Sequence, residues 1–368
     1  MGGDVSTHGR RIQIGGEMQT IAVPRRFERP VLACGARREN AFCIGVGDCA
    51  HLGPQLGDLD GPEALRAYEE AAQSLERSLG VTPELFAHDL DPGCLSTRYA
   101  RGRGKDRAIG VQHHHAHVAS AMAEHGLHGP VIGLAWDGGG YGTDGTDWGG
   151  ELLLADFSGF ERLATFRPIA LSGGHLALAL VDDAFDGDPP QGSLPALSGI
   201  PEGEVRRVRE AIRSGEGSPL SHGVGRLFEA VGALAPGRGL SECDEGERGA
   251  YPLPVDIEAT PWEVDTRPMV RAIVGDLRAG APLPAISARF HNALAKVAAE
   301  LCRRAARLDG KRPVVLGGGC FQNALLAERI REGLAKDFQV HLPREVPPGD
   351  GGLSLGQALV ASALAGRS

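Results

Sequence analysis

The side chains most able to do chemistry lie in the segment VQHHHAHVASAM, which holds four histidines within five residues. His113 and His117 are four residues apart, so on a helix they project from the same face and can share one metal ion. His114 and His115 point elsewhere on the same turn. The spacing alone also fits a histidine-rich helix start with rings in solvent, so nearby carboxylates must decide between the two interpretations.

Two aspartates are placed to complete a metal site. Asp137 follows the apolar segment VIGLAW and precedes a glycine-rich turn, and Asp350 lies in the loop PPGDGGLSLG before the last predicted helix. An ordinary turn role for Asp137 and a helix-cap role for Asp350 remain open. Two imidazoles and two carboxylates suit Fe(II) or Zn(II), and this mixed donor set disfavours Mg²⁺ or Ca²⁺ as the primary ion.

Two glycine-rich segments could approach a nucleotide. LGGGCFQN at 316–323 lies between an apolar strand and a helix, and DGGGYGTDG at 137–145 lies between two strands. Backbone N–H groups there can reach phosphate or ribose because no Cβ stands in the way. Neither segment is a Walker loop or a GxGxxG motif, so plain tight turns remain an alternative. We expect the thiol of Cys320 to be packed rather than reactive.

The bulk composition excludes several classes of protein. The chain has 368 residues, of which 42% are hydrophobic and 23% charged, with 54 glycines, which is typical of a soluble α/β protein with two lobes and a cleft. A formal net charge of −9 without a basic stripe argues against a nucleic acid partner. No stretch reaches the roughly 20 apolar residues of a membrane span. The seven cysteines form no CxxC pair, which indicates reduced thiols in a cytoplasmic protein.

Hydrophobic periodicity predicts the elements that position these residues. Strands are expected at both ends of 31–46 as a hairpin, in ELFAHDL, on both sides of the glycine turn in 131–156, and in 313–318. Helices are expected at 62–79, from about His114, and at 205–214, 225–234, 287–308 and 352–366. The resulting organisation is a flexible tail over 1–28, an N-terminal lobe over 29–130, a C-terminal lobe over 131–349 with a loop insert near 181–203, and a C-terminal helix over 350–368 that packs back on the first lobe.

The sequence resembles the C-terminal module of the HypF carbamoyltransferase family, which helps to make the cyanide ligands of NiFe hydrogenases. The similar segments follow the family's order over 29–361: RPVLACGARRENAFC, LGDLD, AHDLDPGCLSTRYA, VQHHHAHVASAM, DGGGYGTDGTDWGGELLLADF, VGRLFEAVGAL, ARFHNALA, LGGGCFQN and PGDGGLSLGQAL. The resemblance implies a two-lobed ASKHA fold with an interlobe cleft, related to actin-like ATPases, sugar kinases and TsaD-type proteins.

The same resemblance implies roles for individual residues. The implied metal ligands and catalytic residues are His113, His117, Asp137 and Asp350. The implied nucleotide contacts are Gly138, Gly139, Gly140, Glu229, Gly317, Gly318 and Asn323, with Glu229 standing where the family usually has Asp. The general base is left open, and His114 and His115 are the candidates.

The family's reaction supplies an expected function. Its module transfers the carbamoyl group of carbamoyl adenylate to the C-terminal cysteine of HypE and releases AMP. Fe(II) or Zn(II) and an ATP- or AMP-type nucleotide are the implied cofactors, and Mg²⁺ could accompany the nucleotide. The acylphosphatase, zinc-finger and YrdC-like parts that make the adenylate are not recognised in this sequence. We therefore expect a separate protein to supply it.

Departures from the family pattern concern the nucleotide pocket. Glu39 stands where the family has Lys, His175 replaces an Asp, and Tyr251 occupies a position that is often acidic. Three alternatives remain: a small-molecule O-carbamoyltransferase, a threonylcarbamoyl transferase acting on tRNA, and a non-catalytic regulator that binds nucleotide or HypE. The acidic net charge and the HHHAH motif argue against the tRNA enzyme, and the presence of all four implied ligands argues against the regulator.

Overall fold

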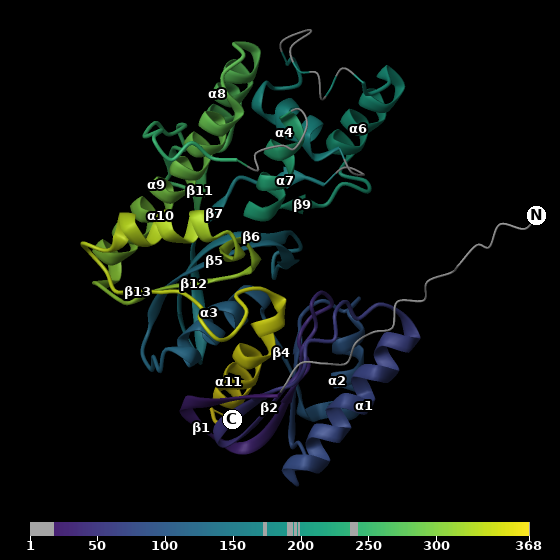
Figure 1. Cartoon of the computed structure of the whole chain (residues 1–368). Coiled ribbons are helices and arrows are strands. Elements are labelled where there is room, and N and C mark those ends of the chain that lie inside the picture. The colour runs from purple at the N-terminus through teal and green to yellow at the C-terminus, as the bar shows by residue number, and fades with distance from the viewer. Residues whose placement is uncertain are drawn as a thin grey trace, which may run out of the picture.

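The structure is a computed structural model that describes residues 18–171, 175–189, 194, 197, 199–235 and 242–367. These residues form two lobes, each built around its own β-sheet, with the N-terminal lobe in purple and blue and the larger lobe in teal and green (Figure 1). The predicted two-lobed α/β class is confirmed.

The first lobe contains a four-stranded sheet covered by two helices on one face. Its elements are β1 (Gln19–Ala33), β2 (Cys43–Leu52), α1 (Gly61–Leu79), β3 (Leu85–Asp89), α2 (Leu95–Gly104) and β4 (Ala108–Val111). The strand order is β2-β1-β3-β4, with β1 and β2 antiparallel and the other neighbours parallel. The core under α1 and α2 includes Phe42, Tyr68, Phe86 and Tyr99.

The prediction of a flexible tail over 1–28 is wrong for residues 19–28, because β1 begins at Gln19. This part of β1 pairs with β2, and Ile21 and Phe27 are buried. The Phe27 ring lies so close to Gly45 that a Cβ there would come within 2.5 Å of it. Pairs of charged residues, Arg25-Arg26 and Glu28-Arg29, interrupt the apolar residues of this strand, so a search for a continuous apolar run misses it. Residues 1–17 lie outside the described residues.

The second lobe is built on an antiparallel meander. Its strands are β5 (Val131–Tyr141), β6 (Asp147–Asp156), β7 (Gly159–Phe166), β8 (Ile169–Ala170), β9 (Leu220–Ser221), β10 (Val255–Asp256), β11 (Trp262–Val264), β12 (Val314–Gly317) and β13 (Val340–His341). β5, β6 and β7 are antiparallel neighbours, whereas β12 lies parallel to β5 and β13 parallel to β12.

Helices cover the outer face of this sheet. They are α4 (Leu176–Ala184), α6 (Glu202–Ser214), α7 (Val224–Leu234), α8 (Arg267–Arg278), α9 (Leu283–Asp309) and α10 (Ala324–Leu334). The predicted loop insert near 181–203 is wrong at both ends, because the apolar run LALALV extends α4 to Ala184 and α6 begins at Glu202. Among the described residues, no helix has both the length and the apolarity needed to cross a bilayer.

Two further helices lie between the sheets. α3 (His113–Glu124) packs on β5 and β12, and α11 (Leu353–Ala365) packs between α3 and the strands β1, β2 and β3. Successive residues of β5 point to opposite faces of the sheet. Ile132 and Leu134 therefore enter the outer core, whereas Val131 and Ala135 enter the core shared with α3 and α11.

Gly356→Ala tests the close packing of α11 on α3. A Cβ at Gly356 would lie 1.8 Å from the carbonyl oxygen of Ala116. Overpacking of this kind costs about 1–3 kcal/mol, more than the roughly 1 kcal/mol that Ala gains over Gly in a helix. We expect urea denaturation to show a lower free energy of unfolding. The matched control Gly275→Ala in α8, where no atom lies within 4 Å of the added Cβ, should not lose stability. Equal stability of both variants would contradict this packing.

Candidate metal centre and cleft

The start of α3 presents the histidine pair. The side chain of Gln112 accepts a hydrogen bond from the backbone N–H of His115 at 3.0 Å and caps the helix, so α3 begins at His113, one residue before the predicted start. His113 and His117 consequently lie on the same face, and both rings are buried. The predicted pairing of these two side chains is confirmed.

The two aspartates reach this pair from different elements. β5 continues through Asp137 and the first glycines to Tyr141, so the predicted glycine turn starts later than expected. The register of β5 against β6 shifts between Trp136 and Gly140, an irregularity of the kind that re-aims a side chain. Asp350 begins the short 3₁₀ helix η3 (Asp350–Gly352), which leads directly into α11.

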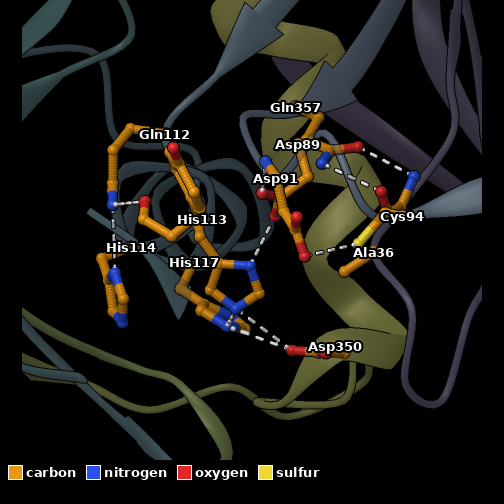
Figure 2. A network of polar contacts seen from close by, with 12 residues as sticks. Ala36, Asp89, Asp91, Cys94, Gln112, His113, His114, His117, Asp350 and Gln357 are labelled. Carbon is orange, nitrogen blue, oxygen red and sulfur yellow. Dashed lines mark hydrogen bonds and ion pairs between the residues drawn. The ribbon is translucent and has the colours of Figure 1, made fainter. Parts of the chain in front are cut away.

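The four side chains converge on one point. The Nε2 atoms of His113 and His117 lie 3.1 Å apart. His117 Nε2 is 2.9 Å from Asp137 Oδ2, and His113 Nε2 is 3.3 Å from Asp350 Oδ1. Figure 2 shows Asp350 directed at both rings. One ligand atom from each residue lies within 4.8 Å of all the others, and no second group of this kind occurs among the described residues.

This arrangement fits a metal ion. Asp137 Oδ2 is buried, and Nε2 of His117 at 2.9 Å is not aligned as a hydrogen-bond donor to it, although buried acceptors are normally satisfied. Two imidazole nitrogens and two carboxylate oxygens that are directed at a common point form the donor set of a Zn(II) or Fe(II) site. His113, His117, Asp137 and Asp350 could therefore hold one such ion.

The electrostatics of the centre favour a cation. Burial lowers the pKa of His113, but the carboxylates of Asp350 and Asp89 outweigh burial, and the pKa of this imidazole lies well above its usual value. Burial would raise the pKa of Asp137, yet the two imidazoles outweigh it and hold that pKa well below its usual value. Both effects show that the carboxylates stay ionised and that their negative charge draws positive charge into the centre.

Asp89 is a member of the site that sequence reasoning missed. It ends β3, and its Oδ2 lies 2.6 Å from Nδ1 of His113 (Figure 2). A carboxylate bonded to Nδ1–H leaves the Nε2 lone pair free to face an ion. The available signal was its place at the carboxyl end of a parallel strand that points toward the start of α3.

Neither remaining histidine of the segment faces the centre. His114 lies beside Gln112 and Trp148, and Figure 2 shows its ring directed away from Asp350. His115 Nε2 contacts the backbone oxygen of Asp156 at 2.6 Å. Because both rings point elsewhere, the structure contradicts their candidacy as the general base.

Asp89→Ala tests the support of His113. Loss of a carboxylate behind a ligating histidine typically weakens metal binding 10–100-fold. We expect the dissociation constant for Zn²⁺, measured by competition with a chromophoric chelator, to rise by about this factor. Asp89→Asn keeps an acceptor and should lose less. Unchanged affinity in both variants would contradict this role.

A hollow of about 360 Å³ opens onto the centre. Its lining contains both carboxylate ligands together with backbone and side chains from both lobes: Arg38, Glu39, Asp58, Asp137, Gly138, Gly139, Arg226, Gly319, Gln322, Gly349 and Asp350. The predicted interlobe cleft is thereby located, because Arg38 and Asp58 belong to the first lobe and Arg226 to the second.

The predicted nucleotide contacts divide into two groups. Gly138 and Gly139 line the hollow, and their contact with a nucleotide stays a prediction. The other three glycines are not among its lining residues, because each packs against the chain itself. A Cβ would meet the ring of His113 at Gly140, the carbonyl oxygen of His117 at Gly317 and the backbone of Trp136 at Gly318.

The remaining two predicted contacts have other roles. Glu229 accepts two hydrogen bonds of 2.8 Å from Arg226 and does not itself line the hollow. Asn323 caps α10 by accepting from the backbone N–H of Leu326, and its amide lies 3.0 Å from the ring of His291. Neither residue lines the hollow, although Glu229 bonds Arg226, which does, and their contact with a nucleotide stays a prediction.

The lining also contains cations that sequence reasoning did not single out. Arg38 and Arg226 line the hollow together with Asp137 and Asp350, and Nε of Arg226 is buried without a hydrogen-bond partner in the structure. Burial raises the pKa of the Cys320 thiol well above its usual value, as expected for a packed thiol. Among the three departures from the family pattern, Glu39 lines the hollow.

The other two departures lie outside the hollow. His175 pairs with Glu204 at 2.8 Å, and the hydroxyl of Tyr251 donates to Asp276 at 2.6 Å. Neither His175 nor Tyr251 is a lining residue. Their substitutions therefore leave the immediate surroundings of the metal centre unchanged.

Two family models match the chain. A family model described as the HypF Kae1-like domain matches residues 26–124. A second, described as the second subdomain of the carbamoyltransferase Kae1-like domain, matches residues 133–357. The chain belongs to the HypF carbamoyltransferase family.

Individual HypF relatives differ in length from the chain. Carbamoyltransferase HypF2 of Cupriavidus necator is 33% identical over 90% of this chain and 46% of its own length. Carbamoyltransferase HypF of a Synechocystis species is 32% identical over 93% of this chain and 48% of its own. The chain thus spans about half the length of these relatives. A HypF homolog of Cupriavidus necator is 36% identical, and there the match covers 90% of this chain and 91% of the relative.

Solved HypF structures share the fold. Full-length HypF in a phosphate- and nucleotide-bound form superposes with a TM-score of 0.85 at 33% identity, covering 94% of this chain and 57% of that one. HypF of T. kodakarensis gives a TM-score of 0.78 at 25% identity, covering 95% and 49%. The ASKHA-type fold implied by the sequence resemblance is confirmed by these matches.

Proposed function

We propose that the chain transfers the carbamoyl group of carbamoyl adenylate to the C-terminal cysteine of HypE in the synthesis of the cyanide ligands of NiFe hydrogenases. The observation that carries this proposal is the convergence of the buried His113 and His117 with the partly buried Asp137 and Asp350, which line the hollow. Membership of the HypF family supports the type of reaction, and the geometry supports its location.

The nucleotide would lie against the glycine-rich backbone beside the centre. Gly138 and Gly139 from β5 and Gly319 from the turn after β12 all line the hollow, where backbone can approach a phosphate closely. The related full-length HypF has been described with phosphate and nucleotide bound, which supports the same class of ligand here.

The metal site would hold Zn(II) or Fe(II). A bound ion acts as a Lewis acid that polarises a carbonyl or phosphoryl oxygen. The chain's part is to supply the four donors and to keep His113 in the correct tautomer through Asp89. Mg²⁺ would accompany the nucleotide rather than occupy this centre, because its donor preference is all-oxygen.

The transfer step balances without an oxidant or reductant. The HypE thiolate attacks the carbamoyl carbon and forms a C–S bond, while the C–O bond to the phosphate breaks and its electron pair leaves with AMP. Arg38 and Arg226 line the hollow where the leaving phosphate gains negative charge. The carboxylates of Glu39 and Asp58 are lining groups that can accept the proton of the acceptor thiol.

The proposal includes a setting for the reaction. HypE is the acceptor, and a separate protein supplies carbamoyl adenylate. All seven cysteines are free, which is compatible with a reducing compartment, and we assign the protein to the cytoplasm.

A transfer assay tests the reaction directly. The purified chain is incubated with carbamoyl adenylate and HypE, and intact-protein mass spectrometry follows the HypE C-terminal cysteine. We expect a mass gain of one carbamoyl group that is lost in His117→Ala, because that variant lacks a ligand of the centre. Full-length HypF serves as the positive control, and no gain with the chain while this control is active would reject the proposal.

Arg226→Met tests the cation beside the glycine turn. A hydrogen bond between charged groups contributes about 1.5–3 kcal/mol, so its loss should weaken AMP binding by about 10–100-fold in calorimetry. Zn²⁺ affinity should not fall, because Arg226 is not a ligand and its positive charge lies in the same hollow as the carboxylates. The control Arg213→Met removes a cation of α6 that does not line this hollow. Equal AMP affinity in both variants would contradict a role for Arg226.

A further inference from the structure

One face of α3 carries four polar side chains, of which two belong to the metal centre and two contact the loop that carries Asp350. His113, His117, Ser120 and Glu124 are spaced by four, three and four residues, which places them along a single side of the helix. The first two are ligands of the centre. Ser120 and Glu124 continue the same line toward the C-terminal end of the helix, where the loop that carries Asp350 begins.

That loop connects β13 to α11 and is fixed at its start by the end of α3. One carboxylate oxygen of Glu124, Oε1, accepts the backbone N–H groups of Arg344 at 2.8 Å and Glu345 at 2.6 Å. The neighbouring His125 ring lies 2.7 Å from the carbonyl oxygen of Leu342. These contacts hold Leu342, Arg344 and Glu345 at the beginning of the loop.

The same helix fixes the end of the loop. The buried hydroxyl of Ser120 donates to the carbonyl oxygen of Gly352 at 2.9 Å. Gly352 is the last residue of η3 and lies two residues after Asp350. Between these two anchors the chain has no strand or helix other than η3, and a backbone hydrogen bond from the N–H of Gly318 to the carbonyl oxygen of Pro348 at 2.8 Å is a further contact of the loop.

We propose that Ser120 and Glu124 are positioning residues of the metal centre, and that α3 acts as the template that sets the distance between Asp350 and the histidine pair. The inference rests on the proposed metal site. Asp350 Oδ1 lies 3.3 Å from His113 Nε2 and 3.6 Å from His117 Nε2. His113, His117 and both anchors of the loop belong to the same rigid helix. The position of Asp350 relative to the two histidines is therefore set by α3.

Metal titration of the full chain separates this role from general stabilisation. The metal-free wild type, Glu124→Ala, Glu124→Gln and Ser120→Ala are titrated with Zn²⁺ for affinity and with Co²⁺ for its visible absorption, which reports the geometry of the ligands. We expect Glu124→Ala and Ser120→Ala to bind Zn²⁺ about tenfold more weakly and to alter the Co²⁺ spectrum. Glu124→Gln keeps the acceptor oxygen and should restore both readouts.

Asp156→Ala is the matched control. Its Oδ1 also accepts two backbone N–H groups, from Ser158 at 2.6 Å and Gly159 at 3.1 Å, but the turn that it fixes carries no ligand. It should leave Zn²⁺ affinity and the Co²⁺ spectrum unchanged. An effect as large as that of Glu124→Ala would overturn the proposal, because it would show that loss of any turn contact disturbs the centre.

The outcomes for the two proposals are distinguishable. A wild-type chain that binds neither Zn²⁺ nor Co²⁺ would reject the metal site itself. A wild-type chain that binds both, with wild-type affinity and spectrum in Glu124→Ala, would overturn only the template role. If Glu124→Ala does not fold, Ser120→Ala decides alone, and its unchanged affinity and spectrum would overturn the inference.

Discussion

The structure depends on compensating the negative charge of two carboxylates that lie close together between the lobes. Asp137 and Asp350 are ionised within a largely closed centre, and uncompensated carboxylates there would be costly. His113 and His117 supply part of the compensation, and the hollow in front of them adds the cations Arg38 and Arg226. The lobes are thus joined by a polar constraint as well as by apolar packing.

The scaffold supports this centre by bringing distant segments together. β3 ends at Asp89, and β5 carries Asp137 at the point where its register against β6 shifts. Asp350 begins η3, which leads into α11. Gln357 of α11 also bonds both backbone groups of Gly35, which ties that helix to the loop that leads to Glu39. Each lobe therefore contributes to the site through an element that is also part of its core.

Sequence patterns predicted the elements and the histidine pair because those depend on local spacing. The four-residue interval that joins His113 and His117 is a property of any helix. Asp89 was missed because its role depends on a contact between segments 24 residues apart. The family resemblance implied nucleotide contacts for Gly140 and Gly317, but it did not indicate that both pack against the histidine helix, because a glycine that allows close approach does not reveal what approaches it.

The location of Asp350 on the segment before α11 has a consequence for biosynthesis. A ribosome makes the chain from its N-terminus, so His113, His117 and Asp137 are synthesised long before Asp350. Until α11 docks against α3 and the first sheet, only His113, His117 and Asp137 are in place, and the side that Asp350 later occupies is open to solvent. The proposed four-donor site is therefore complete only after the segment that carries Asp350 has been made and α11 has docked.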